Sequence, residues 1–299
     1  MSRNRVLFTG SSGFIGRIII PKLPEHDIFT LGRSKSNTIR LDLATQIPSL
    51  DETNIVFHAA GKAHVVPKTR KDRNKFYDVN INGAVNLLKG LSSLHNPPEL
   101  IINLSTVAVY GLNEGELIDE QQPINPNTPY GESKAKAEEL FLEWGRQNGV
   151  AIVNARLPLV SGIDPPGNLG FMLKAIDKGK YFRIGSGRIR KSILWAGDLA
   201  SLVGLRNTPS GNYNLTDGYH PEIREIEDWI GKQLNKNVRT LPVWFIKSAA
   251  QLGDIIPNFP LNNDRFKKLV SPLTFSSTRA EEMLGWNPRP VLTTKLIED

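Results

Sequence analysis

The chain has 299 residues, of which 39% are hydrophobic and 22% charged, and it contains no cysteine. These fractions exclude disordered and fibrous classes, and the lack of cysteine excludes disulfides, thiolate metal sites and a cysteine nucleophile. The formal net charge of +7 favours anionic partners, although no block of like charges indicates a nucleic-acid tail. No stretch approaches the roughly 18 uninterrupted apolar residues of a membrane span, so we expect a soluble, cytoplasmic protein.

The first half of the chain alternates short apolar runs with longer amphipathic stretches, which is typical of parallel βαβ units. We predict strands at Arg5–Thr9, Asp27–Leu31, Thr38–Leu41, Asn54–His58, Leu100–Ser105 and Ala151–Leu157. Between them we predict helices at Gly13–Leu23, Arg70–Leu94 and Tyr130–Asn148. Nearly continuous apolar strands indicate burial on both faces. The predicted fold class is therefore α/β, with a doubly wound parallel sheet of the Rossmann type.

A glycine-rich turn, Thr9-Gly10-Ser11-Ser12-Gly13-Phe14-Ile15-Gly16, joins the first predicted strand to the first predicted helix. Glycine lets the backbone approach a pyrophosphate closely, and the N–H groups and dipole of a helix N-terminus face the anion. The spacing alone also fits a plain tight turn. Its place at the first strand–helix junction of a βαβ chain favours dinucleotide binding.

The end of the second strand indicates which dinucleotide binds. An acidic residue there would bond the ribose 2′-hydroxyl of NAD, whereas an arginine accommodates the 2′-phosphate of NADP. The sequence has Arg33 and Lys35 in this segment, so NADP is favoured over NAD, unless both are ordinary solvated loop charges. Asp42, after the third strand, is a candidate contact for the adenine edge.

The third predicted helix places Tyr130 and Lys134 four residues apart, on one face. A phenol with a pKa of about 10 is a poor base at neutral pH, and a neighbouring ammonium lowers that pKa. Such a pair can exchange a proton with an alcohol while hydride moves at its carbon. A solvated helix face explains most such spacings, so the neighbouring motifs matter. Ser105 and Thr106 end the fifth strand at the sheet edge where ligands bind, or they only cap the chain there.

After Leu157 prolines and glycines interrupt the pattern. We therefore predict that residues 1–161 form the dinucleotide-binding domain and that 162–299 form mainly a smaller α/β substrate-binding domain. A strand near Asn212–Leu215 is expected to rejoin the first domain. Helices are expected near Glu222–Leu234 and Thr278–Leu284.

Three motifs in this order, TGSSGFIG, LSTVAVYG and PYGESK, resemble the extended short-chain dehydrogenase/reductase family. More narrowly, the chain is similar to the NAD-dependent epimerase/dehydratase branch, which acts on nucleotide sugars. The segments HAAG from His58, NING from Asn80 and LGWNP from Leu284 also resemble that branch. The resemblance covers nearly the whole chain. It implies a nucleotide-diphosphate sugar as substrate, a homodimer through the helices near Arg70–Leu94 and Tyr130–Asn148, and no nucleic-acid partner.

The resemblance also implies roles for individual residues. Tyr130 is the catalytic acid/base, Lys134 holds the nicotinamide ribose, and Thr106 contacts the substrate oxygen. The implied cofactor-binding residues are Gly10, Ser12, Gly13, Phe14, Ile15, Gly16, Arg33, Asp42, Leu43, Ala59, Ala60, Gly61, Asn80, Ser105, Tyr130, Lys134 and Pro158. The implied substrate-binding residues are Ser105, Thr106, Asn168, Arg190, Lys191 and Arg265. Arg190 and Lys191 would reach the diphosphate, unless they form a solvated basic turn.

One departure from the family pattern narrows the expected chemistry. Sugar 4,6-dehydratases of this family carry Asp-Glu directly after the catalytic Thr, whereas this chain has Val107 and Ala108, which cannot transfer protons. A 4,6-dehydratase is therefore disfavoured, and we expect a 4-epimerase acting on a UDP- or dTDP-hexose. The alternatives are an NADPH-dependent reductase of nucleotide 4-keto sugars, towards which Arg33 points, and a non-catalytic dinucleotide-sensing or RNA-binding protein.

Two sets of charged or titratable residues are given no functional role. The five histidines show no metal-ligand spacing, so no metal site is expected. Glu138 and Glu139 are expected to form a solvated face of the third predicted helix.

Overall fold

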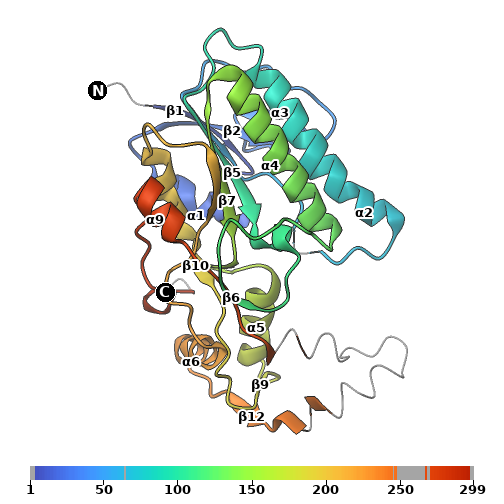
Figure 1. Ribbon diagram of the computed structural model, residues 1–299, viewed down its shortest axis with the longest axis vertical. Coiled ribbons are helices and arrows are strands. Elements are labelled where there is room, and N and C mark those ends of the chain that lie inside the picture. The colour runs from blue at the N-terminus through green and yellow to red at the C-terminus, as the bar shows by residue number, and fades with distance from the viewer. Residues whose placement is uncertain (1–3, 64, 245, 248–266, 268–269, 297–299) are drawn as a thin grey trace.

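The computed structural model describes residues 4–63, 65–244, 246–247, 267 and 270–296. Within these residues, a seven-stranded sheet has the order β11-β7-β5-β4-β1-β2-β3 (Figure 1). Every neighbouring pair is parallel, which confirms the predicted Rossmann-type fold class. The strands are β1 Arg5–Thr9, β2 Asp27–Gly32, β3 Ile39–Arg40, β4 Ile55–His58, β5 Leu100–Thr106, β7 Ala151–Leu157 and β11 Gly211–Asn214.

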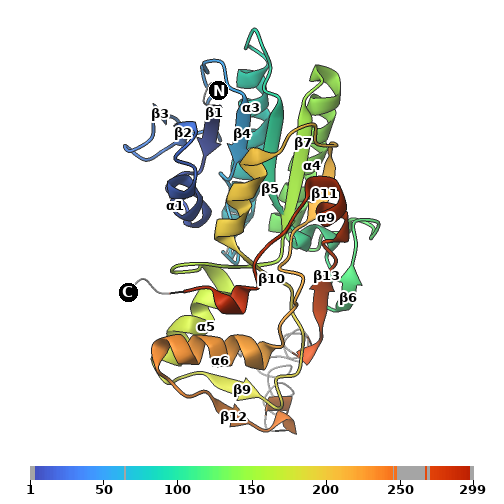
Figure 2. The ribbon, with the colours of Figure 1, turned by 90° about the vertical axis from the view of Figure 1, so that its left-hand side faces the viewer.

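The sheet is covered on both faces, because successive residues of a strand point to opposite sides. In β1, Val6 and Phe8 join one core cluster and Leu7 joins the other. Helices α3 and α4 cover the Leu7 side, whereas α1, η4 and α9 cover the Val6 side (Figure 2). These helices are α1 Phe14–Ile19, α3 Gly83–Leu91, α4 Pro129–Asn148, η4 Ala196–Gly204 and α9 Thr278–Leu284. Segments from the last third of the chain thus complete the core around the first strands.

Helices α5 (Gly167–Asp177) and α6 (Ile223–Leu234) share a third core cluster and lie below the sheet in Figure 1. Three pairs of short parallel strands also form: β8 with β10, β9 with β12, and β6 with β13. The last pair packs against Val109, Tyr110 and Ala135. They are β6 Gly115–Ile118, β8 Leu159–Ser161, β9 Phe182–Ile184, β10 Ile193–Trp195, β12 Arg239–Leu241 and β13 Leu273–Phe275. The sequence analysis did not predict these strands, because three or four residues carry too little period-two pattern.

The single helix predicted over Arg70–Leu94 is interrupted. It consists of α2 (Arg70–Tyr77), the π-helical turn η2 (Asp78–Asn82) and α3, which ends at Leu91. A π turn inserts an extra residue into the helix and often occurs at functional sites. Here it carries Asn80, whose contacts are described below. A hydrophobic pattern cannot reveal the turn, because the apolar stripe continues through it.

The helix predicted over Gly13–Leu23 is also shorter than expected. The α-helical part ends at Ile19, and Ile20–Lys22 form the 3₁₀ turn η1. Pro21 lies within this segment, and proline has no N–H to continue an α-helix. The turn therefore ends the helix before the chain enters β2.

Candidate active site

The glycine-rich turn after β1 is shaped by close backbone contacts. Gly10 has a φ of +75°, and a Cβ atom added there would lie 2.7 Å from the backbone of Ala59 and Ala60. A Cβ atom at Gly16 would lie 2.5 Å from the carbonyl oxygen of Ser11. Only glycine fits either position, so the turn packs directly against the segment that follows β4.

A cleft of about 580 Å³ opens beside this turn, within the size range of small-molecule sites. It lies at the carboxyl ends of β1, β2 and β4, the edge at which open parallel sheets bind ligands. Nine of the predicted cofactor residues line it: Gly10, Ser12, Gly13, Arg33, Asp42, Leu43, Ala59, Ala60 and Gly61. The glycine cradle and the polar lining fit a dinucleotide. Phe14, Ile15 and Gly16 lie in α1, behind the turn, and Pro158 lies between β7 and β8.

The end of β2 presents a cation to the cleft rather than a carboxylate. Arg33 directly follows β2, is exposed, and lines the cleft together with Ser34. The segment is held by Asn37, which accepts a hydrogen bond from the Ser11 hydroxyl (2.6 Å) and donates to the Ser34 carbonyl (3.1 Å). The Asp42 carboxylate accepts from the Ala44 N–H (3.0 Å). The loop that carries Arg33 is therefore anchored beside the cleft.

The structure brings Thr106 and Tyr130 together, although 23 residues separate them in the sequence. Thr106 is the last residue of β5, and Tyr130 lies in the first turn of α4, which is capped by Thr128. Burial raises the pKa of Tyr130, while a hydrogen bond with the Thr106 side chain lowers it. Thr106 Oγ1 also accepts from the Ala108 N–H (3.2 Å), so the capping role and the site role coexist. The net pKa shift of Tyr130 is upward, which corrects the expectation of a lowered pKa, because burial outweighs the opposing contribution.

Lys134, one turn further along α4, is only 5% exposed. Burial lowers its pKa to about 8, against the carboxylate of Glu138, which raises it. Its charge acts in turn on His58 at the end of β4, where burial and Lys134 lower the imidazole pKa to about 3. His58 is therefore neutral, and its Nδ1 lies 2.8 Å from Thr9 Oγ1.

Asn80, in the π turn, connects the loop beside the cleft to α4 by hydrogen bonds. Its Nδ2 donates to Ser133 Oγ (2.9 Å) and to the Lys62 carbonyl (3.2 Å), and its Oδ1 accepts from the Lys62 N–H (2.7 Å). Lys62 directly follows Gly61, a lining residue of the cleft. The extra residue of the π turn thus places an amide between the loop after β4 and the start of α4.

Two residues next to the predicted catalytic groups have partners that the sequence analysis missed. The Ser105 hydroxyl donates to Glu138 (2.5 Å), and Glu138 forms an ion pair with Arg156 (2.7 Å). Glu138 is 1% exposed, so its predicted place on a solvated face is wrong, whereas Glu139 is exposed and pairs with Lys136. Tyr130, Lys134 and Glu138 follow one another at intervals of four, which places all three on the same helix face. That spacing could have identified Glu138.

Two of the predicted substrate-binding residues, Arg190 and Lys191, donate hydrogen bonds to backbone carbonyls of the second region. Arg190 donates to the His220 carbonyl (3.0 Å) and Lys191 to the Ser271 carbonyl (2.9 Å), so both side chains brace their own region. Asn168 is exposed in the first turn of α5. Arg265 lies outside the described residues.

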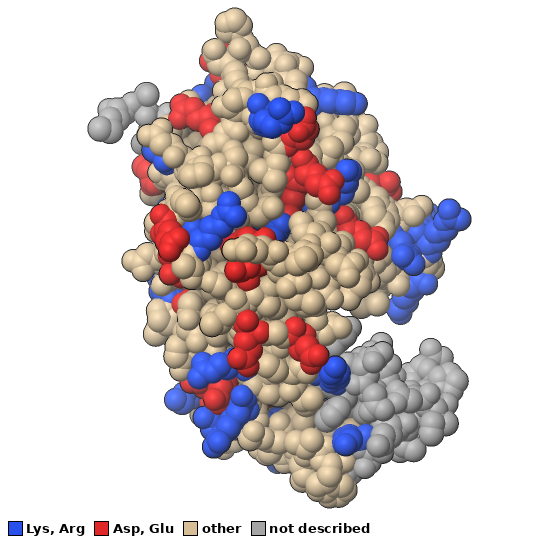
Figure 3. Space-filling model, in the orientation of Figure 1, with Lys and Arg blue, Asp and Glu red and all other residues tan. Residues whose placement is uncertain are grey.

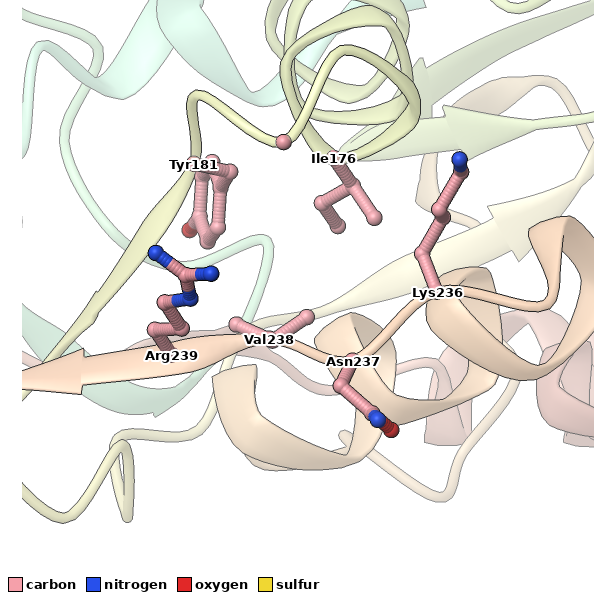
Figure 4. A pocket seen from close by; sticks show the side chains of 7 residues that line it. Ile176, Tyr181, Lys236, Asn237, Val238 and Arg239 are labelled. Carbon is pink, nitrogen blue, oxygen red and sulfur yellow. The ribbon is translucent and has the colours of Figure 1, made fainter.

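A second cavity, of about 350 Å³, lies between the end of α5 and β12 (Figure 4). Its lining combines the apolar side chains Ile176 and Val238 with the cations Lys236 and Arg239. Tyr181 also lines it and donates to Glu227 (2.8 Å). None of the predicted site residues that the structure describes lines this cavity.

Two general features concern the described part of the chain only. No helix there is long and apolar enough to cross a membrane, and no group of three or more acidic or histidine side chains is arranged to hold a metal ion.

Protonation of His58 should control stability in acid. The pKa of His58 falls from 6.5 to about 3 on folding. Between these two pH values His58 is therefore protonated in the unfolded chain but neutral in the folded protein. Stability is therefore lost as the pH falls from 6.5 towards 3, by about 2 kcal/mol at pH 5.

We expect His58→Asn, which retains a hydrogen-bonding partner for Thr9, to remove that loss. Urea unfolding at pH 7 and pH 5 measures it, with His95→Asn, an exposed histidine, as the control that keeps the wild-type pH dependence. Equal acid losses in wild type and His58→Asn would contradict the assignment.

A family model, curated proteins and solved structures are similar to this chain over most of its length. A model of the NAD dependent epimerase/dehydratase family matches residues 6–212. The N-acetyl-alpha-D-glucosaminyl-diphospho-ditrans,octacis-undecaprenol 4-epimerase of Escherichia coli O157:H7 is 28% identical over 297 residues, covering 92% of this chain and 88% of the relative.

Solved structures share the fold over nearly the whole length. The UDP-glucuronic acid 4-epimerase from Bacillus cereus, in complex with UDP-glucuronic acid and NAD, matches with a TM-score of 0.74 and 19% identity, covering 96% of this chain and 95% of the other. RMD from Pseudomonas aeruginosa, complexed with NADPH, matches with a TM-score of 0.70 and 20% identity, covering 97% and 94%.

Proposed function

The chain belongs to the NAD-dependent epimerase/dehydratase family, and we propose that it is a nicotinamide-dependent 4-epimerase of a nucleotide-diphosphate hexose. The observation that carries the proposal is the meeting of Thr106, at the end of β5, with Tyr130, in the first turn of α4, one helical turn from the buried Lys134 and at the same sheet edge as the glycine-lined cleft. The 4-epimerase activity named for the Escherichia coli relative supports it. Residues of the second region, from 162 onwards, would hold most of the sugar nucleotide.

The proposed chemistry assigns one task to each of three side chains. A nicotinamide dinucleotide, held by the glycine turn and the loop after β4, would supply hydride acceptance and return. When the C4–H bond breaks, the hydroxyl O–H bond breaks too, and its proton passes to the Tyr130 phenolate. Thr106 orients the sugar oxygen through its hydroxyl. The ammonium of Lys134, one turn along α4, would offset the negative charge of the phenolate.

Epimerisation follows if the 4-keto sugar turns over before hydride and proton return. Val107 and Ala108 begin the η3 turn (Val107–Tyr110) directly after Thr106. Neither side chain can take a proton from the sugar or protonate a departing hydroxyl. We therefore expect no dehydrated product.

The test is incubation of the purified protein with UDP- and dTDP-hexoses and with a polyprenyl-diphosphate-linked sugar, followed by NMR of the sugar. A new C4 epimer supports the proposal. The alternative, a 4-keto-sugar reductase, predicts instead stoichiometric loss of NADPH absorbance at 340 nm with a 4-keto substrate. Neither signal, together with tight RNA binding, would favour a non-catalytic protein and overturn the proposal.

Arg33 should decide between the two dinucleotides. We propose NADP as the preferred cofactor, because the guanidinium lines the cleft and can pair with a 2′-phosphate. We expect Arg33→Ala to weaken NADPH binding about tenfold and NADH binding less than twofold, since an exposed charged hydrogen bond contributes roughly 1–2 kcal/mol. Fluorescence titration measures both, with Lys35→Ala, which lies outside the cleft lining, as the control. Equal losses for the two cofactors would contradict this role.

We also propose a homodimer through α2, α3 and α4. Figure 3 shows cationic side chains gathered at α2. The exposed cations of this helix are Arg70, Lys71, Arg73 and Lys75. In a twofold dimer the cationic side chains of α2 would have to lie away from α2 of the partner subunit, because like charges repel. Static light scattering distinguishes a dimer from a monomer.

A further inference from the structure

Glu138 is a buried carboxylate whose charge the proposed reaction does not use. It lies on α4 one turn after Lys134, and its two oxygens accept from Ser105 Oγ and from Nε and Nη2 of Arg156 at 2.5–3.3 Å. The guanidinium also donates to the Tyr110 hydroxyl (2.9 Å). The Glu138 side chain is thus held from β5 on one side and from β7 on the other.

The charges around Lys134 single out this carboxylate. From β4, the neutral His58 adds no charge. On α4 itself Tyr130 precedes Lys134 by one turn, and Glu138 follows it. From β7, Arg156 adds a second cation that lies against Glu138.

Two tyrosines on elements packed against α4 have hydrogen-bond partners other than Lys134. Tyr77 of α2 donates to Glu132, and Tyr110 of η3 donates to Asn214 (2.8 Å). Among the described residues, Glu138 is the anion that acts on the buried ammonium.

We propose that Glu138 is a positioning residue that keeps Lys134 charged, so that the ammonium can stabilise the Tyr130 phenolate during proton transfer. It acts through Lys134 and does not touch substrate. The proposal rests on the proposed function of Tyr130 and Lys134. Arg156 fixes the orientation of Glu138 by a bidentate contact, the geometry in which guanidinium and carboxylate pair best.

Removing the charge of Glu138 should shift the pH dependence of kcat rather than lower kcat equally at every pH. Burial alone favours neutral lysine, and an opposite charge nearby favours the ammonium. Glu138→Gln keeps the size and a carbonyl oxygen for Ser105, but it removes the charge and leaves Arg156 uncompensated. Lys134 then loses its proton at lower pH, so the alkaline limb of the kcat profile should move down by about one pH unit, with about a tenfold loss at pH 8 relative to the variant's own plateau.

Three variants separate this role from a structural one. Glu139→Gln removes an exposed carboxylate one residue away and should keep the wild-type alkaline limb. Glu138→Gln combined with Arg156→Met removes both charges of the buried ion pair, which proteins often tolerate. This double variant replaces Glu138→Gln in the test if the single variant does not fold. Relative to Arg156→Met with Glu138 intact, the double variant should also show the lower limb.

A second measurement does not depend on turnover. NMR titration of lysine labelled with ¹³C at Cε, with the Lys134 signal identified by its loss in Lys134→Met, should show protonation of Lys134 at lower pH in Glu138→Gln. An unchanged Lys134 titration in the folded Glu138 variants overturns the inference. A shifted titration without turnover on any sugar instead overturns the proposed function and leaves the effect of Glu138 on Lys134 standing.

Discussion

Replacing Tyr130 with phenylalanine is expected to lower kcat about a thousandfold, while leaving cofactor binding within about twofold of wild type. The hydroxyl is the group through which the proton of the sugar would pass, and general acid–base catalysis contributes typically 10²–10⁴-fold. The ring would remain packed near Phe76 of α2, with ring centroids 6.2 Å apart, so the fold should be preserved. Epimer formation followed by NMR gives the rate, and NADPH fluorescence gives the binding.

Tyr77→Phe is the matched control for this experiment. Tyr77 lies on α2 and donates to Glu132, which places a second tyrosine hydroxyl against the same helix without a contact to Thr106. Its removal should change kcat by less than about threefold. If Tyr130→Phe were as active as Tyr77→Phe, Tyr130 could not be the acid/base.

Replacing Arg156 with methionine is expected to destabilise the protein by about 3–5 kcal/mol, because it leaves the carboxylate of Glu138 buried without its cation. Both side chains are about 1% exposed, so water cannot take the place of the guanidinium. The Tyr110 hydroxyl loses its donor as well. Thermal and urea unfolding should show a drop in Tm of roughly 10 °C.

The exposed pair Arg146–Glu143 is the control for the buried pair. Their side chains are 73% and 54% exposed, and surface ion pairs contribute about 0–1 kcal/mol. Arg146→Met should therefore change stability by less than about 1 kcal/mol. An equal effect of the two substitutions would show that the buried pair is not coupled as the contacts indicate.

The sequence by itself determined the local features of this protein. The alternation of apolar runs and amphipathic stretches predicted the seven strands of the main sheet and the helices between them, because residues two or four apart decide which side an element buries. The turn from Gly10 to Gly16 could be recognised from its glycine spacing directly after the first strand, and the contact of Gly16 with the Ser11 carbonyl is local. The spacing of Tyr130 and Lys134 placed both on one helix face before any packing was known.

Only the tertiary structure decided which of these local features meet. Thr106 lies near Tyr130 because β5 ends, and α4 begins, at the same edge of the sheet. No local sequence pattern predicts that contact. The same packing buries Glu138 between Ser105 and Arg156, which come from two neighbouring parallel strands, β5 and β7. The sequence shows a glutamate on a helix, and whether water or an arginine surrounds it depends on strands 33 and 18 residues away. Contacts over such distances depend on how the sheet assembles, so the charge environment of Lys134 is a property of the fold.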